Sequence, residues 1–174
     1  MSFDPQPTLM GERVIVRPLA PTDWVALYAA AADPLIWEQH PAADRWKEDV
    51  FRAFFNDALD LRVTGGGGAF AIIDKATGEV IGSSRYKIVA GDTVEIGWTF
   101  LVRKHWGDGT NAELKRLMLA HAFQSFDAVR FRVGFDNIRS RKAVEKLGAR
   151  LVGEDAPTGH PAHVTYEMKR DDWR

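Results

Sequence analysis

The amino-acid sequence predicts an α+β fold in which helices flank a mixed, mainly antiparallel sheet, with residues 1–174 forming a single domain. The length fits one hydrophobic core and leaves little room for a second. Three strand-like segments joined by short turns lie in the middle of the chain, and short turns make sequential strands antiparallel. Helical and strand-like patterns alternate after them, which is typical of a sheet with both strand directions.

The first third of the chain predicts one strand and two helices. Residues 12–19 alternate apolar and basic side chains, as a half-buried strand does. Residues 21–23 (Pro-Thr-Asp) form a helix start, and apolar side chains recur at helical spacing from Trp24 to Ala31. A second helix is expected after Asp44. Its apolar stripe consists of Val50, Phe54, Ala58 and Leu61.

A run of four glycines, Gly65–Gly68, follows the second predicted helix. A glycine-rich phosphate loop needs a Lys-Ser/Thr pair after it, and this run has none, so we interpret it as a flexible connector. Residues 69–74 and 79–87 flank the turn 75–78 and predict a hairpin. Residues 93–102 have the strongest strand pattern in the chain and complete the meander.

The second half of the chain alternates between helix and strand. We expect a helix over residues 110–126, a strand over 128–135 and a helix over 138–147. Two further strands are expected near residues 150–153 and 164–169. The sequence shows no internal repeat and no low-complexity linker.

Composition and charge argue against several function classes. The formal net charge is −1 and both signs are mixed along the chain, whereas nucleic-acid-binding proteins usually carry a basic patch. The chain has no cysteine, which excludes disulfides, thiolate zinc sites and an acetyl-cysteine intermediate. The five histidines lack metal-ligand spacing. With no signal-peptide pattern and no apolar run of about 18 residues, the sequence predicts a cytoplasmic protein without nucleic-acid or membrane partners.

The stretch from Lys104 to Glu113 carries the clearest chemical signal. It follows the strongest predicted strand and opens an amphipathic helix. Gly107 and Gly109 lack a Cβ and allow a ligand to approach the backbone closely. The amides of the first helical turn have no partner within the helix, and the helix dipole is positive there. We therefore expect an anion site suited to a pyrophosphate. The apolar side of this helix consists of Leu114, Leu117, Met118, His121 and Ala122.

Two phosphate-bearing ligands are compatible with this stretch. Gly107, Gly109 and Ala112 fit the dinucleotide fingerprint G-x-G-x-x-G/A, and Asp136 follows the next strand, where an acid could bind a ribose. A dinucleotide-binding fold, however, consists of parallel strands and usually opens with this motif, whereas here the motif follows an antiparallel meander. Coenzyme A is the other candidate.

Three segments follow one another at residues 95–98 (EIGW), 106–113 (WGDGTNAE) and 137–149 (NIRSRKAVEKLGA). They resemble the strand before the pyrophosphate loop, the loop itself and the second signature of the GNAT superfamily of N-acetyltransferases. Within the superfamily the chain is most similar to the Rim-type branch, which is ribosomal-protein N-acetyltransferase-like. The resemblance extends from Gly11 to Met168 and is carried by the order and spacing of the three segments.

The resemblance implies a GNAT-like fold and an acetyl-CoA-dependent N-acetyltransferase, in which a primary amine attacks the thioester directly. In this superfamily the strand before the loop splays from its neighbour, and its free backbone groups hold the pantetheine arm. Arg139, Arg141 and Lys142 are candidates for contacts with nucleotide phosphates. The cofactor-binding residues implied are Phe100, Leu101, Val102, Lys104, Trp106, Gly107, Gly109, Thr110, Asn111, Asn137 and Ser140.

Two departures from the family pattern bear on the chemistry. Lys104 stands where the loop pattern has Gln or Arg, which keeps a positive charge. Val144 stands where many members have a Tyr that protonates the leaving thiolate, so a tyrosine mechanism is not expected. Ser140 matches a serine that Rim-type enzymes place near the sulfur. We expect its hydroxyl to donate a hydrogen bond or relay a proton to the thiolate, the alternative being a local bond to the preceding turn.

A base is also needed, because a lysine-type amine has a pKa of about 10.4 and must lose a proton before it attacks. Glu95 is the candidate, acting directly or through water, since strand alternation places it on one face with Gly97 and Thr99. The alternative is that Glu95 forms an ion pair with Arg85 or Lys87 across the sheet.

The sequence leaves open the role of two histidines and the identity of the acceptor amine. His160 and His163 precede the last predicted strand, near the place where Rim-type enzymes bring in an acidic base. The acceptor is a small-molecule amine or a protein N-terminus, in a pocket expected around Trp37, the connector Gly65–Gly68 and the final hairpin. A homodimer is compatible with the family. The alternative functions are a non-catalytic acyl-CoA-binding module, which Val144 permits, and a nicotinamide-linked oxidoreductase.

Overall fold

The computed structural model describes residues 2–155, 159 and 161–174, and its eight strands form one sheet in the order β1-β2-β3-β4-β5-β6-β8-β7. The strands are β1 (Leu9–Met10), β2 (Val14–Pro18), β3 (Gly67–Asp74), β4 (Val80–Ala90), β5 (Thr93–Leu101), β6 (Ala128–Gly134), β7 (Arg150–Glu154) and β8 (His163–Lys169). The α-helices are α1 (Trp24–Ala31), α2 (Glu48–Thr64), α3 (Thr110–Ala122) and α4 (Ile138–Lys146). Four short 3-10 turns, η1 (Pro21–Asp23), η2 (Pro34–Ile36), η3 (Arg103–His105) and η4 (Arg170–Asp172), complete the described part.

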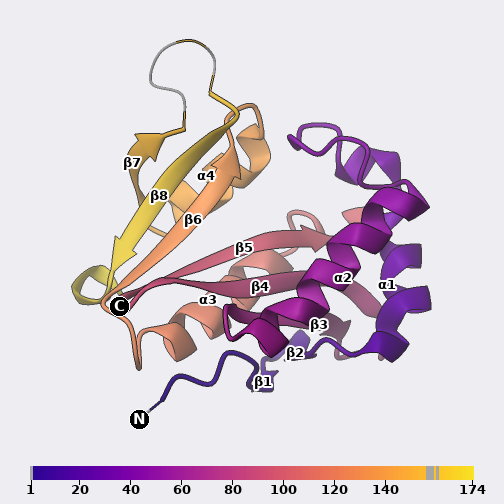
Figure 1. Cartoon of the computed structure of the whole chain (residues 1–174), viewed down its shortest axis with the longest axis horizontal. Coiled ribbons are helices and arrows are strands. Elements are labelled where there is room, and N and C mark those ends of the chain that lie inside the picture. Colours follow the sequence, from indigo (N-terminus) through magenta and orange to yellow (C-terminus); the bar gives the residue numbers. More distant parts are fainter. Residues whose placement is uncertain (1, 156–158, 160) are drawn as a thin grey trace.

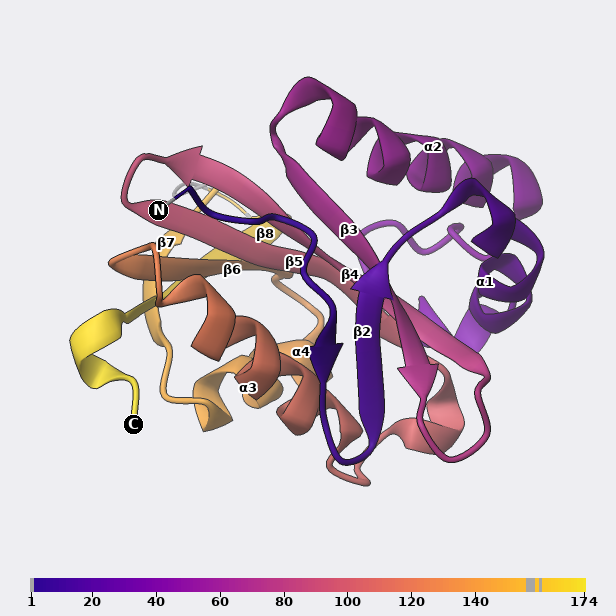
Figure 2. The same cartoon turned by 90° about the horizontal axis from the view of Figure 1, so that it is seen from below.

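The sheet has the predicted mixed character. Strands β1 to β5 pair antiparallel in sequence order, β5 and β6 pair parallel, and β6, β8 and β7 pair antiparallel again. Helices α1 and α2 cover one face, and α3 and α4 cover the other (Figure 2). The predicted α+β fold, with helices flanking a mainly antiparallel sheet, is therefore confirmed. None of the helices in the described ranges combines the length and apolarity needed to cross a bilayer.

Each face of the sheet carries its own hydrophobic core. The core under α3 and α4 includes Tyr86, Met118 and Phe131, and the core under α1 and α2 includes Phe51 and Phe100. The predicted apolar stripe of α2 was wrong at two positions, because Val50 and Leu61 are only partly buried. The residues of α2 that enter the core are Phe51, Phe54, Phe55 and Ala58.

The glycine run is shorter as a connector than predicted. Gly65 adopts a left-handed conformation (φ 74°) that ends α2, while Gly67 and Gly68 already belong to β3 and pair with Lys87 and Tyr86. A Cβ on Gly67 would lie 1.9 Å from the Tyr86 carbonyl oxygen, so glycine is required for this close pairing of strands. Only two residues of the run connect the helix to the sheet.

Strands β5 and β6 separate soon after they begin. Their parallel pairing covers only Thr93–Glu95 opposite Ala128–Arg130, yet β5 continues to Leu101 and β6 to Gly134. Figure 1 shows the two strands diverging, with β8 beside β6. We call residues 96–101 of β5 and 131–134 of β6 the strand fork. The resemblance implied such a divergence, which the residue types alone do not indicate.

Candidate functional site

A bulge in β5 shapes one arm of the strand fork. Ser83 pairs with Phe100 and Arg85 with Gly97, so two residues of β5, Trp98 and Thr99, stand opposite one residue of β4. Trp98 has a φ of 52°, the only positive value at a non-glycine residue in the described chain. Backbone outliers of this kind concentrate at functional sites. The bulge therefore marks this strand as a candidate site.

The bulge also corrects a prediction about the faces of β5. Glu95 and Gly97 do share a face, because a Cβ on Gly97 would lie 4.0 Å from the Glu95 side chain. Thr99 lies on the opposite face, where its Oγ1 hydrogen-bonds to Ser84 Oγ at 2.8 Å and accepts from Lys115 Nζ. The expected common face of Glu95 and Thr99 was wrong, since the extra residue shifts the alternation by one.

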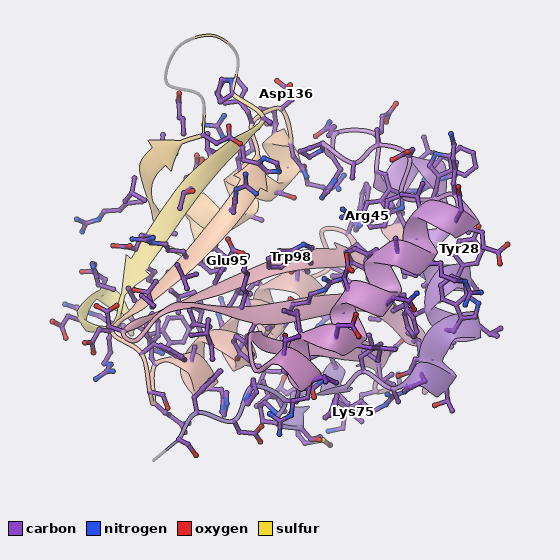
Figure 3. All side chains as sticks on the ribbon, in the orientation of Figure 1. Tyr28, Arg45, Lys75, Glu95, Trp98 and Asp136 are labelled. Carbon is purple, nitrogen blue, oxygen red and sulfur yellow. The ribbon has the colours of Figure 1, made fainter. Side chains whose placement is uncertain are left out.

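Glu95 lies at the base of the strand fork, on the last residue pair that joins β5 to β6. Figure 3 shows it on the edge of β5 that faces the opening. Burial raises the pKa of its carboxyl, and the positive charges of Lys87, Arg132 and Arg130 partly offset this rise. Within the described residues no ion pair or hydrogen bond involves its side chain, so the ion pair considered as its alternative role is not formed. A half-buried carboxylate with a raised pKa is suited to take up a proton.

The loop before α3 presents backbone amides. Gly107 and Gly109 both have left-handed φ values (74° and 91°), and successive amides in such turns can converge on an anion. In the described structure the amides of Gly107, Gly109 and Asn111 donate no hydrogen bond. The Thr110 amide, also expected at this site, instead donates to Asp108 Oδ1 at 2.9 Å. Three of the four expected amides are thus available to a ligand.

Trp106 ties the end of β5 to the loop and to α4. Its indole Nε1 donates to the Leu101 carbonyl at 2.9 Å, and the Arg139 guanidinium lies 3.5 Å from the centre of its ring. The Val102 amide donates to the Ile81 carbonyl at 2.9 Å. Neither the Leu101 carbonyl nor the Val102 amide is free, contrary to prediction. The backbone groups left for a pantetheine arm lie earlier in β5.

Helix α4 begins as the sequence predicted. Asn137, 5% exposed, caps the helix because its side-chain oxygen accepts from the Ser140 amide at 3.3 Å. The Ser140 hydroxyl makes no hydrogen bond to any described residue, so its alternative role as a local bond is not observed. Val144 is buried in the core. Arg141 donates to the hydroxyl of Tyr166 at 3.1 Å, which gives it a structural role instead of a free phosphate-binding one.

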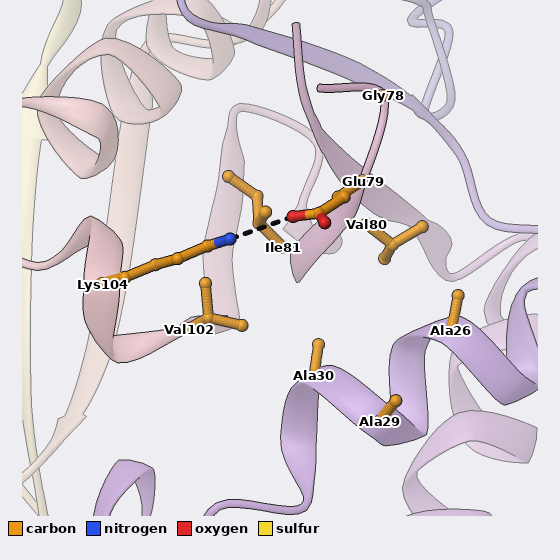
Figure 4. Close-up of a pocket in the computed structure, with 9 residues that line it drawn as sticks. All are labelled: Ala26, Ala29, Ala30, Gly78, Glu79, Val80, Ile81, Val102 and Lys104. Atoms are coloured by element: carbon orange, nitrogen blue, oxygen red, sulfur yellow. Dashed lines mark hydrogen bonds and ion pairs between the residues drawn. The ribbon is translucent and has the colours of Figure 1, made fainter. Parts of the chain in front are cut away.

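The side chain of Lys104 points away from the loop that contains Gly107 and Gly109, which we call the glycine loop. Its Nζ donates to Glu79 Oε2 at 2.9 Å, as Figure 4 shows. This pair borders a surface cavity of about 350 Å³ between α1 and the start of β4. An anion at the loop would therefore meet the Lys104 side chain only if the pair with Glu79 opened.

Residues 38–47, between η2 and α2, reach the far end of β6. A Cβ on Gly134 would lie 2.6 Å from Pro41, so the two residues are in direct contact. Burial lowers the pKa of His40 to about 4, and the charges of Arg45, His163 and Arg139 add to this effect. This segment thus meets α4 and β8 at the open end of the strand fork, as the purple loop beside α4 in Figure 1 illustrates.

Other predicted residues lie elsewhere. Trp37 is 2% exposed and its indole donates to the Ala31 carbonyl, so it belongs to the core and does not line a pocket as expected. Phe100 packs against it. His163 Nδ1 lies 3.1 Å from Asp155 Oδ2. His160 lies outside the described residues.

Lys115 is a buried residue that the sequence analysis missed. It is 7% exposed, and its ammonium donates to Thr99 and lies 5.9 Å from the Phe131 ring centre, below the strand fork. Burial lowers its pKa to about 7. Its position three and four residues before Met118 and Leu119 was the available signal, because side chains at that spacing share a helix face. Leu114, Met118 and Ala122 of the predicted apolar side are buried, whereas Leu117 and His121 are only partly buried and Lys115 and Leu119 take their place.

Comparisons with known proteins agree with this geometry. Residues 13–150 match the family model described as acetyltransferase (GNAT) domain. A relative named uncharacterized N-acetyltransferase p20, from Bacillus licheniformis, is 27% identical over 150 residues, which cover 84% of either chain. A GCN5-related N-acetyltransferase structure from Brucella melitensis has a TM-score of 0.78 at 20% identity, covering 97% of this chain and 80% of that one. Mycobacterium smegmatis RimJ in complex with CoA-disulfide has a TM-score of 0.72 at 17% identity, covering 91% and 83%. The two structures are similar in fold.

Replacing the buried ammonium should change how stability depends on pH. The folded-state pKa of Lys115 is about 7 and that of an unfolded lysine is about 10.4, so between these values only the unfolded chain carries the proton. The free energy of unfolding should then rise with pH, by up to ~1.4 kcal/mol per unit. Lys115→Met should remove this rise, whereas Lys146→Met, on the exposed end of α4, should keep it. Urea unfolding across this pH range tests it, and an unchanged slope in Lys115→Met contradicts it.

Proposed function

The chain belongs to the GNAT acetyltransferase family, and from this we propose that it transfers the acetyl group of acetyl-CoA to a primary amine. The acceptor amine belongs to a small molecule or to a protein N-terminus, and we propose that the reaction takes place in the cytoplasm. One observation carries the proposal: the strand fork opens beside a loop whose amides of Gly107, Gly109 and Asn111 have no partner in the described structure.

The residues present fit a CoA thioester. Free amides at a helix start favour binding of a pyrophosphate. Backbone groups of β5 that are unpaired along the strand fork can hydrogen-bond to the amides of a pantetheine arm. Family members take their acetyl group from acetyl-CoA, which supplies an activated thioester carbonyl when bound. We propose that Gly107, Gly109 and Asn111 hold the diphosphate, and that Asn137 and Trp106 border the arm. Phe100 and Leu101 would contribute mainly by fixing the strand.

Glu95 and Ser140 are the proposed catalytic residues. A half-buried carboxylate at the base of the strand fork can take the proton of the attacking amine directly or through water, and its raised pKa favours this role. The Ser140 hydroxyl has no partner among the described residues, which leaves it able to donate to the leaving sulfur. Much of the remaining acceleration would come from positioning, because holding both reactants in place reduces the entropic barrier.

We also propose that the chain belongs to the Rim-type branch of the family. Val144 is 6% exposed and packs in the core, so no hydroxyl is available from this position to protonate the thiolate. Ser140, one helical turn earlier, is the nearest replacement on α4. Val144 also supports a second hypothesis, in which the protein is a binding module that holds acyl-CoA without turnover. The nicotinamide hypothesis loses its support, since the only parallel pairing among the described strands covers three residues of each strand.

Ligand binding tests the proposal first. A compound that binds only the folded state raises its stability, by ~2.7 kcal/mol at a hundredfold excess over Kd. Acetyl-CoA and CoA should raise the melting temperature, and NADPH should not. Release of CoA on addition of an amine then separates an enzyme from a binding module. A response to NADPH alone, or to none of the three, contradicts the proposal.

Loss of the serine hydroxyl should slow the chemical step only. For Ser140→Ala we expect kcat to fall by about tenfold to a hundredfold, because proton transfer in the transition state contributes at this scale. The Kd for acetyl-CoA should stay within a factor of about two. Ser125→Ala, at an exposed turn after α3, is the matched control and should leave both values unchanged. Equal kcat in Ser140→Ala and wild type would remove Ser140 from the mechanism.

The pH profile should identify the base. The carboxylate of Glu95 acts only when deprotonated, so kcat/KM should rise as pH passes upward through its raised pKa. Glu95→Gln keeps the size of the side chain but cannot accept the proton. We expect kcat/KM to fall by about a hundredfold or more and the acidic limb to disappear. An acidic limb that persists in Glu95→Gln assigns the base to another group, such as His163.

A further inference from the structure

A buried arginine without a counter-charge lies on the face of the sheet under α2. Arg85 is 4% exposed, and its Nη2 donates to the Phe54 carbonyl at 2.6 Å. Its Nε is buried and has no hydrogen-bond partner among the residues that the structure describes. In the described structure no carboxylate lies within ion-pair distance of it. A buried guanidinium normally has such a partner, because burying an unpaired charge is strongly destabilising.

Aromatic contacts do not account for this arrangement. The guanidinium carbon of Arg85 lies 4.1 Å from the ring centre of Phe54 and 5.5 Å from that of Trp98. A cation–π contact contributes less than the desolvation of a charged group costs. Burial lowers the pKa of Arg85, and the charge of Arg45 adds to this effect while that of Asp57 opposes it. Folding alone therefore gives no reason for the charge.

A second guanidinium shares the same aromatic ring. The guanidinium carbon of Arg45 lies 4.5 Å from the Phe54 ring centre. Burial lowers the pKa of Arg45, and the charge of Asp44 opposes the effect without forming an ion pair. Two neighbouring cations without a bound carboxylate repel each other. Such a pair is suited to bind an oxyanion, since guanidinium groups match carboxylate and phosphoryl geometry with two parallel bonds.

The position of these cations assigns them to the acceptor. On the same sheet face, Arg85 pairs with Gly97 and the neighbouring Lys87 pairs with Glu95. Diagonal neighbours in a sheet lie about 7–8 Å apart, so Arg85 and the proposed base occupy adjacent positions on this face of the sheet. Figure 3 shows Glu95 and Trp98 on the edge of β5 that faces the opening, with Arg45 on the α2 side. The glycine loop, by contrast, leads into α3 on the other face.

We propose that the acceptor is a small amine that also carries an oxyanion, foremost a carboxylate, which Arg85 and Arg45 bind while Glu95 faces the amine. The inference rests on the proposed function and narrows its substrate class. The short spacing favours a compound of amino-acid size. A protein N-terminus, which carries a cation without an adjacent carboxylate, does not use these arginines.

Anion binding can be tested without catalysis. Malonate and phosphate, against chloride at equal ionic strength, are the probes, and the readout is the melting temperature of wild type, Arg85→Met and Arg52→Met. Arg52 also lies over an aromatic ring, 3.7 Å from the centre of Trp24, but it is exposed and has Glu48 at 3.7 Å. General exclusion of these salts from protein surfaces acts on all three proteins alike. We expect an additional shift in wild type and Arg52→Met that Arg85→Met lacks.

The variant also separates binding from a structural role. If Arg85 serves a ligand, Arg85→Met should be as stable as wild type in chloride or more stable, because it removes an unpaired buried charge. If Arg85→Met does not fold, Arg45→Met, in which the lost group is only half-buried, gives the same comparison of anion shifts. Equal shifts in all variants overturn the inference. They would leave the proposed function intact as long as acetyl-CoA still raises the melting temperature.

Turnover tests the substrate class directly. Matched pairs are free amino acids against their amides, and phosphoethanolamine against ethanolamine. We expect the anionic member to have a kcat/KM higher by about tenfold or more, and Arg85→Met to lose this preference. A preference for phosphoethanolamine supports the oxyanion site and identifies a phosphoryl group as its ligand. Equal rates within the pairs, or a preference for peptide N-termini, overturn the inference. If no pair is acetylated, the anion shifts decide.

Discussion

The short pairing between β5 and β6 is the constraint on which the site depends. Three residue pairs join the strands, and beyond Glu95 each strand keeps only its outer partner, β4 on one side and β8 on the other. The sheet can afford this break because each half has its own antiparallel neighbours and its own contacts with helices. The backbone amides and carbonyls that would pair in a continuous sheet are left to hydrogen-bond with a ligand. The glycine loop, the bulge and Glu95 all lie along this break.

The two faces of the sheet divide the chemistry between them. On the α3 face, amides with no partner in the described chain and a capped α4 suit a phosphorylated cosubstrate. On the α2 face, Glu95, Arg85 and Arg45 suit a second reactant that carries both an amine and an oxyanion. Arg85 and Lys115 are both buried without a carboxylate partner in the described part of the chain. A buried charged group without such a partner destabilises the folded chain, so function explains its place beside the strand fork better than stability does.

The sequence predicted what local patterns determine. The order of strands and helices, the glycine loop and the start of α4 at Ile138 all follow from neighbouring residues, and the structure confirms the fold class. The bulge at Trp98 could not be predicted, because the alternation across Glu95–Thr99 looks regular and the extra residue appears only when β4 is paired. The strand fork came from resemblance alone. Lys115 was missed because a lysine on an apolar stripe is usually taken as its solvent edge, while only tertiary contacts place its ammonium beside Thr99.

The contact between Pro41 and Gly134 has a consequence for how the site can change. A proline ring rests where any larger side chain at position 134 would stand, so the segment crossing the open end of the strand fork sits as close to β6 as atoms permit. The distance between this segment and β6 is thereby fixed by Pro41 and Gly134. Exchanging that glycine for a bulkier residue would push the segment away from β6. The position of this segment can thus change through residue 134 while Glu95 and Ser140 stay the same.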